Sequence, residues 1–138
     1  MPHYLVMKSI KDRSGNERPL LCVVVDDDES IRESLPDLIE EFGFAARAFS
    51  SAEEFLSCGC LDETSCLVLD IAMPGMSGLE LHQELKRRGE QVPIIFMTGQ
   101  KDETIRARAL EQDAAGFLLK PFSDAALLAA ITTALQDV

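Results

Sequence analysis

Five short apolar segments alternate with amphipathic stretches along most of the chain, and this alternation limits the possible folds more than any other feature. The apolar segments span residues 20–25, 45–49, 66–70, 93–97 and 116–119. Several are apolar at consecutive positions, which is typical of strands that are buried on both faces of a sheet. We therefore predict five strands separated by helical connections.

The stretches between these segments carry apolar residues at helical spacing. Three such stripes are Ile31, Leu35, Leu38, Ile39 and Phe42; Leu79, Leu81 and Leu85; and Leu127, Leu128, Ile131 and Leu135. Parallel strands need crossover connections, which are right-handed and place helices against the sheet. The sequence therefore predicts an α/β fold: a doubly wound five-stranded parallel sheet with helices on both faces and the flavodoxin-like order 2-1-3-4-5.

Local signals indicate where the helices begin and bend. Ser51 and Glu54 have the spacing of a capping box, and Ser123 is placed to cap the last helix. Pro36 lies inside the first helical stretch, where it removes a backbone hydrogen bond. We predict that this helix continues through Pro36 but bends there.

The length and charge of the chain exclude several kinds of protein. Its 138 residues suit one domain, and residues 1–19 are polar and unpatterned. We expect a flexible leader over residues 1–19 and a single domain over residues 20–138. The net charge of −11 argues against nucleic acid or an anionic membrane as a direct partner of this domain, because both would repel it. The same charge is compatible with cation binding.

The four cysteines do not form the pattern of a disulfide framework. Cys22 and Cys66 lie in apolar segments, where a free thiol behaves as a small hydrophobic group. Cys58 and Cys60 are either a metal or redox pair or part of a plain loop, and we favour the loop because structural zinc needs four ligands. No signal peptide or membrane-spanning stretch is visible, so we expect a cytoplasmic protein with reduced cysteines.

Polar residues follow four of the five predicted strands, at the point where each strand ends. They are Asp26 and Asp27 after the first strand, Asp70 at the end of the third, Thr98 after the fourth and Lys120 after the fifth. Ligands of such folds bind outside the carboxyl ends of the strands. We therefore expect these side chains to meet at one edge of the sheet.

The acidic residues at this edge predict a metal site. Taken alone, the run of acids at residues 26–29 is explained by a solvated helix N-terminus, which favours negative charge. That explanation does not account for Asp70, which ends a core strand far along the chain. Carboxylates that repel one another are tolerated when a hard cation neutralises them, and Mg²⁺ (or Mn²⁺) prefers such oxygen ligands.

Asp70 is the candidate nucleophile of this site. A carboxylate beside Mg²⁺ can attack phosphorus and form an aspartyl phosphate. Thr98 can donate a hydrogen bond to a phosphoryl oxygen, and Lys120 can place a positive charge next to it. Each of these two residues alone is better explained as an ordinary strand-end hydroxyl or an exposed lysine. Together with three acids, they favour a phosphoryl site.

Four motifs resemble those of the receiver domains of two-component response regulators. They are VVVDDDESIR at residues 23–32, LVLDIAMPGMSG at 67–78, IIFMTG at 94–99 and GFLLKPF at 116–122. Each motif is modest alone, but all four occur in the family's order and spacing. The resemblance covers about residues 20–136, so residues 20–138 are expected to be a receiver domain.

The resemblance assigns expected roles to the residues at the strand ends. It implies that Asp70 is the phosphoacceptor, that Asp27 binds the metal directly and that Asp26 assists, often through water. The backbone carbonyl of Ala72 would complete the metal site. Thr98 would be the switch hydroxyl, and Lys120 would contact the phosphoryl group.

Further expectations concern switching and phosphoryl lifetime. Phe117 occupies the position of the family's switch aromatic, although a plain core role would also explain it. The bond between Lys120 and Pro121 is expected to be cis, as in the family. Ala72 and Gln100 occupy rate-tuning positions, and neither is a strong base toward water. We therefore expect an aspartyl phosphate that is not unusually short-lived.

The resemblance also implies partners. A sensor histidine kinase would supply the phosphoryl group, and the surface of the fourth helix, fifth strand and fifth helix would change on phosphorylation. An output domain or a second copy of the chain would dock there. The protein would not be an enzyme beyond Mg²⁺-dependent self-phosphorylation and slow self-dephosphorylation.

Two other classes of protein share parts of this pattern. A haloacid-dehalogenase-like phosphatase also uses an aspartate nucleophile, but it needs a second acid two residues later, where this chain has Ala72. A flavodoxin-like carrier binds phosphate in the loop after the first strand, and here that loop is the acidic run at residues 26–29. Both readings are less favoured than a receiver.

The kind of response regulator is a separate question. The chain is either a stand-alone receiver or the front part of a transcription factor. Segments 43–55 and 116–122 resemble receivers of the nitrogen-fixation regulator type, which precede a DNA-binding helix-turn-helix. We therefore expect a longer transcription regulator whose DNA binding resides outside this acidic domain.

Overall fold

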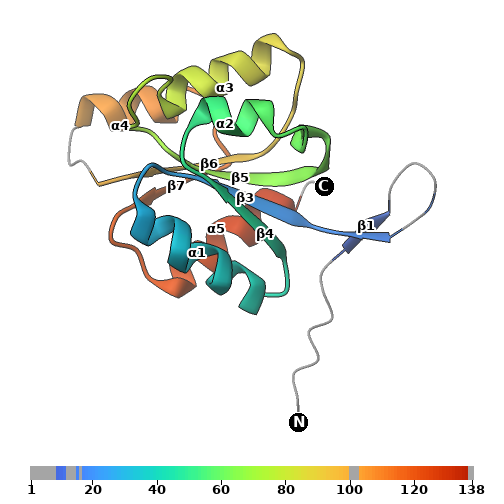
Figure 1. Cartoon of the computed structure of the whole chain (residues 1–138). Helices are drawn as coiled ribbons and strands as arrows, with labels where there is room; N and C mark the ends of the chain where they lie inside the picture. Colours follow the sequence, from blue (N-terminus) through green and yellow to red (C-terminus); the bar gives the residue numbers. More distant parts are fainter. Residues whose placement is uncertain (1–8, 12–14, 16, 100–102, 137–138) are drawn as a thin grey trace.

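The computed structural model describes residues 9–11, 15, 17–99 and 103–136. Its main feature is a five-stranded parallel sheet between two layers of helices (Figure 1). The strands are β3 (Leu21–Val25), β4 (Ala45–Phe49), β5 (Thr64–Asp70), β6 (Ile94–Thr98) and β7 (Gly116–Leu119). Their order in the sheet is β4-β3-β5-β6-β7, which confirms the predicted flavodoxin-like order and fold class.

The helices divide between the two faces of the sheet (Figure 1). Helices α1 (Glu29–Glu41) and α5 (Asp124–Leu135) cover one face. Helices α2 (Ala52–Ser57), α3 (Gly78–Arg87) and α4 (Glu103–Leu110) cover the other, and a 3₁₀ turn, η1 (Leu61–Glu63), leads into β5. No helix in the described part of the chain is both long enough and apolar enough to cross a membrane.

Each face of the sheet has its own apolar core. Successive side chains of a strand point to opposite faces. Val23 and Val25 therefore join the core under α2, α3 and α4, whereas Cys22 and Val24 join the core under α1 and α5. All four side chains are fully buried, which explains why the strand is apolar at consecutive positions.

The helix ends follow most of the local signals. Ser51 caps α2 by accepting from Glu54 N, and Ser123 caps α5 by accepting from Ala126 N. The complete capping box is at the start of α3 instead, because the Glu54 carboxylate binds Ser50 rather than returning to the backbone of Ser51. Helix α1 continues through Pro36; a bend there stays a prediction.

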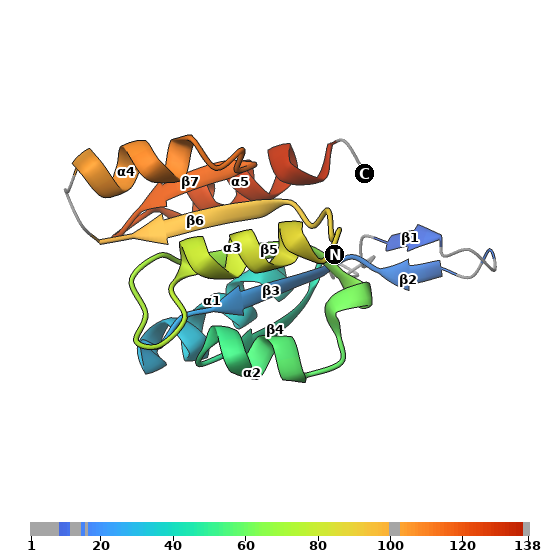
Figure 2. The same cartoon turned by 90° about the horizontal axis from the view of Figure 1, so that it is seen from above.

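A two-stranded antiparallel sheet precedes β3 and projects from the main sheet in both views (Figures 1 and 2). It pairs β1 (Ser9–Lys11) with β2 (Glu17–Pro19). Regular structure was not expected within residues 1–19. Backbone pairing over three residues needs no apolar face, so polarity alone did not reveal it. That residues 1–19 form a flexible leader remains a prediction.

The cysteines differ from expectation at one pair. Cys22 and Cys66 are buried free thiols, as predicted, but Cys58 and Cys60 form a disulfide. The expectation of a plain loop with reduced cysteines was therefore wrong. The turn between α2 and η1 brings the two Cα atoms to 5.4 Å, which is within the span of a disulfide. A disulfide between cysteines only two positions apart does not produce the cysteine spacing of a disulfide framework, so the sequence did not indicate it.

Candidate functional site

The carboxyl ends of the parallel strands bring distant polar residues to one edge of the sheet. Asp26 follows β3, Asp70 ends β5 and Thr98 ends β6. Backbone hydrogen bonds extend the sheet to these positions: Asp26 N donates to Phe49 O at 3.1 Å, and Lys120 N donates to Thr98 O at 2.8 Å. The backbone therefore fixes where each of these side chains begins.

Asp26 is fully buried and both of its carboxylate oxygens are held. Its Oδ1 accepts from the backbone N–H of Asp28 at 2.9 Å, and its Oδ2 accepts from Lys120 Nζ at 2.7 Å. Its backbone carbonyl accepts from the guanidinium of Arg32 at 3.1 Å. These contacts fix a charged group at the bottom of the site.

Asp70 lies beside this pair and is 5% exposed. Its Oδ1 is 3.6 Å from Lys120 Nζ. Burial, followed by the negative charge of Asp26, raises the pKa of Asp70 to about 6, although Lys120 and the backbone N–H of Ala72 oppose the change. The pKa of Lys120 is itself raised: burial would lower it, but the hydrogen bond with Asp26 and the nearby carboxylates outweigh that effect.

Three carboxylates at this edge could hold a metal ion together. Asp26, Asp27 and Asp70 each offer one oxygen, and these oxygens lie within 4.8 Å of one another. Asp27 is exposed, so a metal held there could keep water ligands. Among the described residues, Lys120 is the cation that contacts the carboxylates of Asp26 and Asp70. One lysine does not balance three acids, so a divalent cation would reduce the remaining negative charge. The donors are all hard oxygen atoms, which fits Mg²⁺ or Mn²⁺.

The other expected site residues, apart from Gln100, lie in the described part of the chain. Thr98 is buried, 1% exposed, and Phe117 on β7 packs partly buried against the core under α2, α3 and α4. The peptide bond between Lys120 and Pro121 is cis. Ala72 lies two residues after Asp70, and Gln100 lies outside the described residues.

Gly78 is a site residue to which the sequence assigned no role. A Cβ atom at this position would lie 2.3 Å from the backbone oxygen of Asp70 and 2.9 Å from Ile71 Cα. The first turn of α3 therefore packs directly on the backbone of the candidate nucleophile. The signal was present, because Gly78 closes the motif that begins before Asp70, but only the structure shows the close approach.

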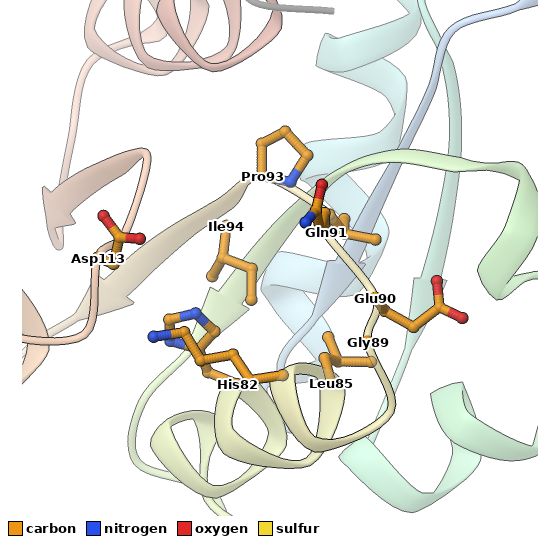
Figure 3. A pocket seen from close by; sticks show the side chains of 10 residues that line it. His82, Leu85, Gly89, Glu90, Gln91, Pro93, Ile94 and Asp113 are labelled. Carbon is orange, nitrogen blue, oxygen red and sulfur yellow. The ribbon is translucent and has the colours of Figure 1, made fainter.

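A separate pocket of about 430 Å³ lies at the opposite end of the sheet (Figure 3). It is lined by the end of α3, including His82, and by Pro93 and Ile94 at the start of β6. His82 is buried against the ring of Phe96, and burial lowers its pKa. Because β6 separates this pocket from Thr98, it is not part of the carboxylate site.

Comparison with known proteins agrees with this geometry. Residues 22–132 match the family model described as the response regulator receiver domain. The chain belongs to this family. The match covers most of the chain, and the resemblance inferred from the four sequence motifs is thereby confirmed.

Individual relatives of this receiver domain include a transcriptional regulatory protein and a response regulator. The transcriptional regulatory protein FixJ of Azorhizobium caulinodans is 46% identical over 112 residues, which cover 81% of this chain and 53% of that protein. The response regulator protein TodT of Pseudomonas putida is 39% identical over 124 residues, covering 90% and 55%. The chain thus spans about half the length of these curated relatives.

A solved structure shows the same fold. The structure described as FixJ-N superposes with a TM-score of 0.79 at 33% identity, covering 88% of this chain and 97% of that one. The receiver domain therefore corresponds to almost the whole of an independently determined unit. In the present chain, Asp26, Asp27 and Asp70 lie at the carboxyl ends of the strands, where ligands of doubly wound folds bind.

Proposed function

We propose that this receiver domain accepts a phosphoryl group on Asp70 from a phosphohistidine of a sensor histidine kinase, in a Mg²⁺-dependent reaction. The observation that carries the proposal is the position of Asp70. Its buried carboxylate lies 3.6 Å from the ammonium of Lys120 and within reach of two further acids that can share a cation. The burial of Asp26 and Asp70 next to each other is what supports this proposal over a solvated acidic run.

The transfer follows from the groups around Asp70. A carboxylate oxygen of Asp70 attacks the phosphorus in line, a new P–O bond forms, and the P–N bond to the kinase histidine breaks. Lys120, held by Asp26 at 2.7 Å, places a positive charge beside the incoming phosphoryl oxygens. Bound Mg²⁺, held by Asp26, Asp27, Asp70 and the carbonyl of Ala72, would offset the repulsion between the anionic nucleophile and the anionic donor.

The phosphoryl group should persist long enough to signal. Ala72 presents no side chain that could act as a base toward attacking water, and the neutral amide of Gln100 is similarly unsuited. The same absence of an acid at Ala72 disfavours a phosphatase of the haloacid-dehalogenase type. A switch is therefore the better proposal than a hydrolase.

The signal would leave the site through Thr98 and Phe117. We expect the hydroxyl of Thr98 to bind the phosphoryl group and Phe117 to rotate inward, which changes the surface formed by α4, β7 and α5. Leu119 on β7 is 44% exposed, the one large apolar side chain so exposed in the described part of the chain. An output domain or a second receiver could cover it. The description of FixJ as a transcriptional regulatory protein favours transcription control as the output.

The test is phosphoryl incorporation from acetyl phosphate with Mg²⁺, measured by intact mass. The unchanged chain should gain one phosphoryl group, and Asp70→Asn should gain none. Asp62→Asn is the matched control, because Asp62 is exposed at the opposite end of β5. Incorporation that survives Asp70→Asn would show that another residue is the acceptor.

A further inference from the structure

The disulfide between Cys58 and Cys60 has no part in the phosphoryl site. It joins the end of α2 to the start of η1, across the single residue Gly59. The two cysteines differ in exposure: Cys58 is half-buried, whereas Cys60 is 2% exposed. Attack from solvent is therefore expected at Cys58 rather than at Cys60.

This bond should contribute little to the stability of the domain. A disulfide stabilises chiefly by restricting the unfolded chain, and a loop with one intervening residue offers very little to restrict. Other contacts already hold both flanks. Phe55 of α2 is fully buried, and the carbonyl of Cys60 accepts from Thr64 Oγ1 at 2.9 Å and from Glu63 N at 3.1 Å. Opening the bond should leave these contacts in place.

A backbone hydrogen-bond donor also lies next to the sulfur of Cys58. The backbone N–H of Cys60 donates to Cys58 Sγ at 3.1 Å. A hydrogen bond of this kind supports negative charge on sulfur, and thiolates are the species that exchange with disulfides. Cys58 is thus both reachable and provided with a hydrogen-bond donor.

The other two cysteines provide an internal contrast. Cys22 and Cys66 lie opposite each other on β3 and β5, and both are fully buried. The hydrogen bond with Cys22, together with burial, raises the pKa of Cys66 well above its usual value. These two thiols should be inert while the domain is folded.

We propose that Cys58 and Cys60 form a reversible redox site whose substrate class is a dithiol reductant or, in the opposite direction, a small disulfide. A thiolate of the dithiol attacks Cys58 Sγ, the bond to Cys60 breaks, and Cys60 leaves as a thiolate that takes up a proton. The second thiol of the reductant then attacks its own sulfur in the mixed disulfide and releases Cys58. Two electrons pass to the protein, and the reductant becomes a cyclic disulfide.

The experiment uses the full chain in its folded state. The oxidised protein is treated with dithiothreitol without denaturant, alkylated with iodoacetamide and analysed by intact and peptide mass. We expect rapid alkylation at Cys58 only after reduction, and alkylation at least about tenfold slower at the buried Cys60, Cys22 and Cys66. Removing the reductant and adding oxidised glutathione should restore the bond.

Matched variants separate exchange from unfolding. Cys60→Ser should leave Cys58 open to alkylation without any reductant, whereas Cys58→Ser should leave the buried Cys60 slow to react. Circular dichroism should show the same fold before and after reduction. Two results would each overturn the proposal: reduction that occurs only when urea exposes all four cysteines, or a pair that stays reduced in oxidised glutathione.

Discussion

The middle of each of two strands is apolar, whereas the end of the same strand carries a buried carboxyl group. Within β5, Leu67, Val68 and Leu69 are fully buried and apolar. Removing each of these side chains from water stabilises the folded state. The next residue, Asp70, is buried almost as deeply but carries a carboxyl group whose pKa is raised to about 6. On β3, the apolar Val25 is followed in the same way by the fully buried Asp26.

The difference shows which part of the sheet stabilises the folded state and which part destabilises it. The strand interiors supply two apolar cores, one on each face of the sheet. The strand ends hold like charges close together, with Lys120 as the cation between Asp26 and Asp70. Such an arrangement costs free energy in the absence of another cation, and that cost is what a bound metal would relieve. Four substitutions test this contrast.

The largest effect is expected in the interior, at Leu67. Leu67→Ala removes a fully buried side chain and leaves a cavity, so the free energy of unfolding should fall by about 3–4 kcal/mol. Urea unfolding measures the loss. Mg²⁺-dependent phosphoryl incorporation in the folded fraction should persist, because the substitution does not alter the charges at the strand end. If Leu67→Ala kept its stability but no longer incorporated a phosphoryl group, the separation between a stabilising interior and a reactive strand end would be contradicted.

The next effect is expected at the strand ends, at Lys120. Lys120→Met leaves Asp26 buried without its partner at 2.7 Å and removes the positive charge near Asp70. Without Mg²⁺ the free energy of unfolding should fall by about 2–3 kcal/mol, and Mg²⁺ should restore part of it.

Lys86→Met is the matched control for Lys120→Met. Lys86 is exposed on α3, so this change should cost less than about 0.5 kcal/mol. Equal losses from the two lysine substitutions would contradict a special role for the charge between Asp26 and Asp70.

Gly78 connects the two regions, since α3 packs there on the backbone of Asp70. Helix propensity alone predicts that Gly78→Ala stabilises the protein. The structure predicts the opposite sign, because the new Cβ would lie 2.3 Å from the Asp70 oxygen, so we expect a loss of about 2 kcal/mol in urea unfolding. Phosphoryl incorporation should also slow as Asp70 moves.

Gly116→Ala is the matched control for Gly78→Ala. Its new Cβ would meet Ile95 Cγ1 at 3.4 Å, an ordinary contact. Gly116→Ala should change the free energy of unfolding little. A gain in stability from Gly78→Ala would contradict the prediction and show that the backbone of Asp70 can move to accept the new Cβ atom.

The contrast also explains how far the sequence alone could predict the molecule. Consecutive apolar residues predicted the strands, and the carboxyl-end rule predicted that Asp26, Asp70 and Lys120 would share an edge. The hydrogen bond from Lys120 to Asp26 could not be predicted, because these residues are 94 positions apart and their distance depends on strand register. The close approach of Gly78 depends in the same way on helix packing.

Short local structures were missed for a different reason. The pairing of β1 with β2 and the bond between Cys58 and Cys60 depend on turn geometry rather than on apolar pattern. A polar segment gives no periodic signal, and a cysteine pair separated by one residue resembles any loop. Backbone conformation decides both, and composition carries little information about it.

The smallest expected effect reverses the usual sign of a mutation. The pKa of Asp70 rises from 3.8 to about 6 on folding, so between these values the folded state binds more protons than the unfolded state. Stability should therefore fall as the pH rises from about 4 to about 6 and stay reduced above it. Asp70→Asn removes this penalty, which corresponds to at most about 3 kcal/mol, but it also weakens the hydrogen bond that the carboxylate accepts from Ala72 N–H. The metal-free protein should therefore gain about 1 kcal/mol at about pH 7.5.

The difference in the free energy of unfolding between Asp70→Asn and the unchanged chain should disappear near about pH 4. At about pH 7.5 it should change sign when Mg²⁺ is added, because only the unchanged chain retains Asp70 as a ligand. Urea unfolding at both pH values, with and without Mg²⁺, measures all four cases, and Asp62→Asn serves again as the control. If Asp70→Asn were less stable than the unchanged chain without metal at about pH 7.5, the strand end would not carry the electrostatic cost that distinguishes it from the interior.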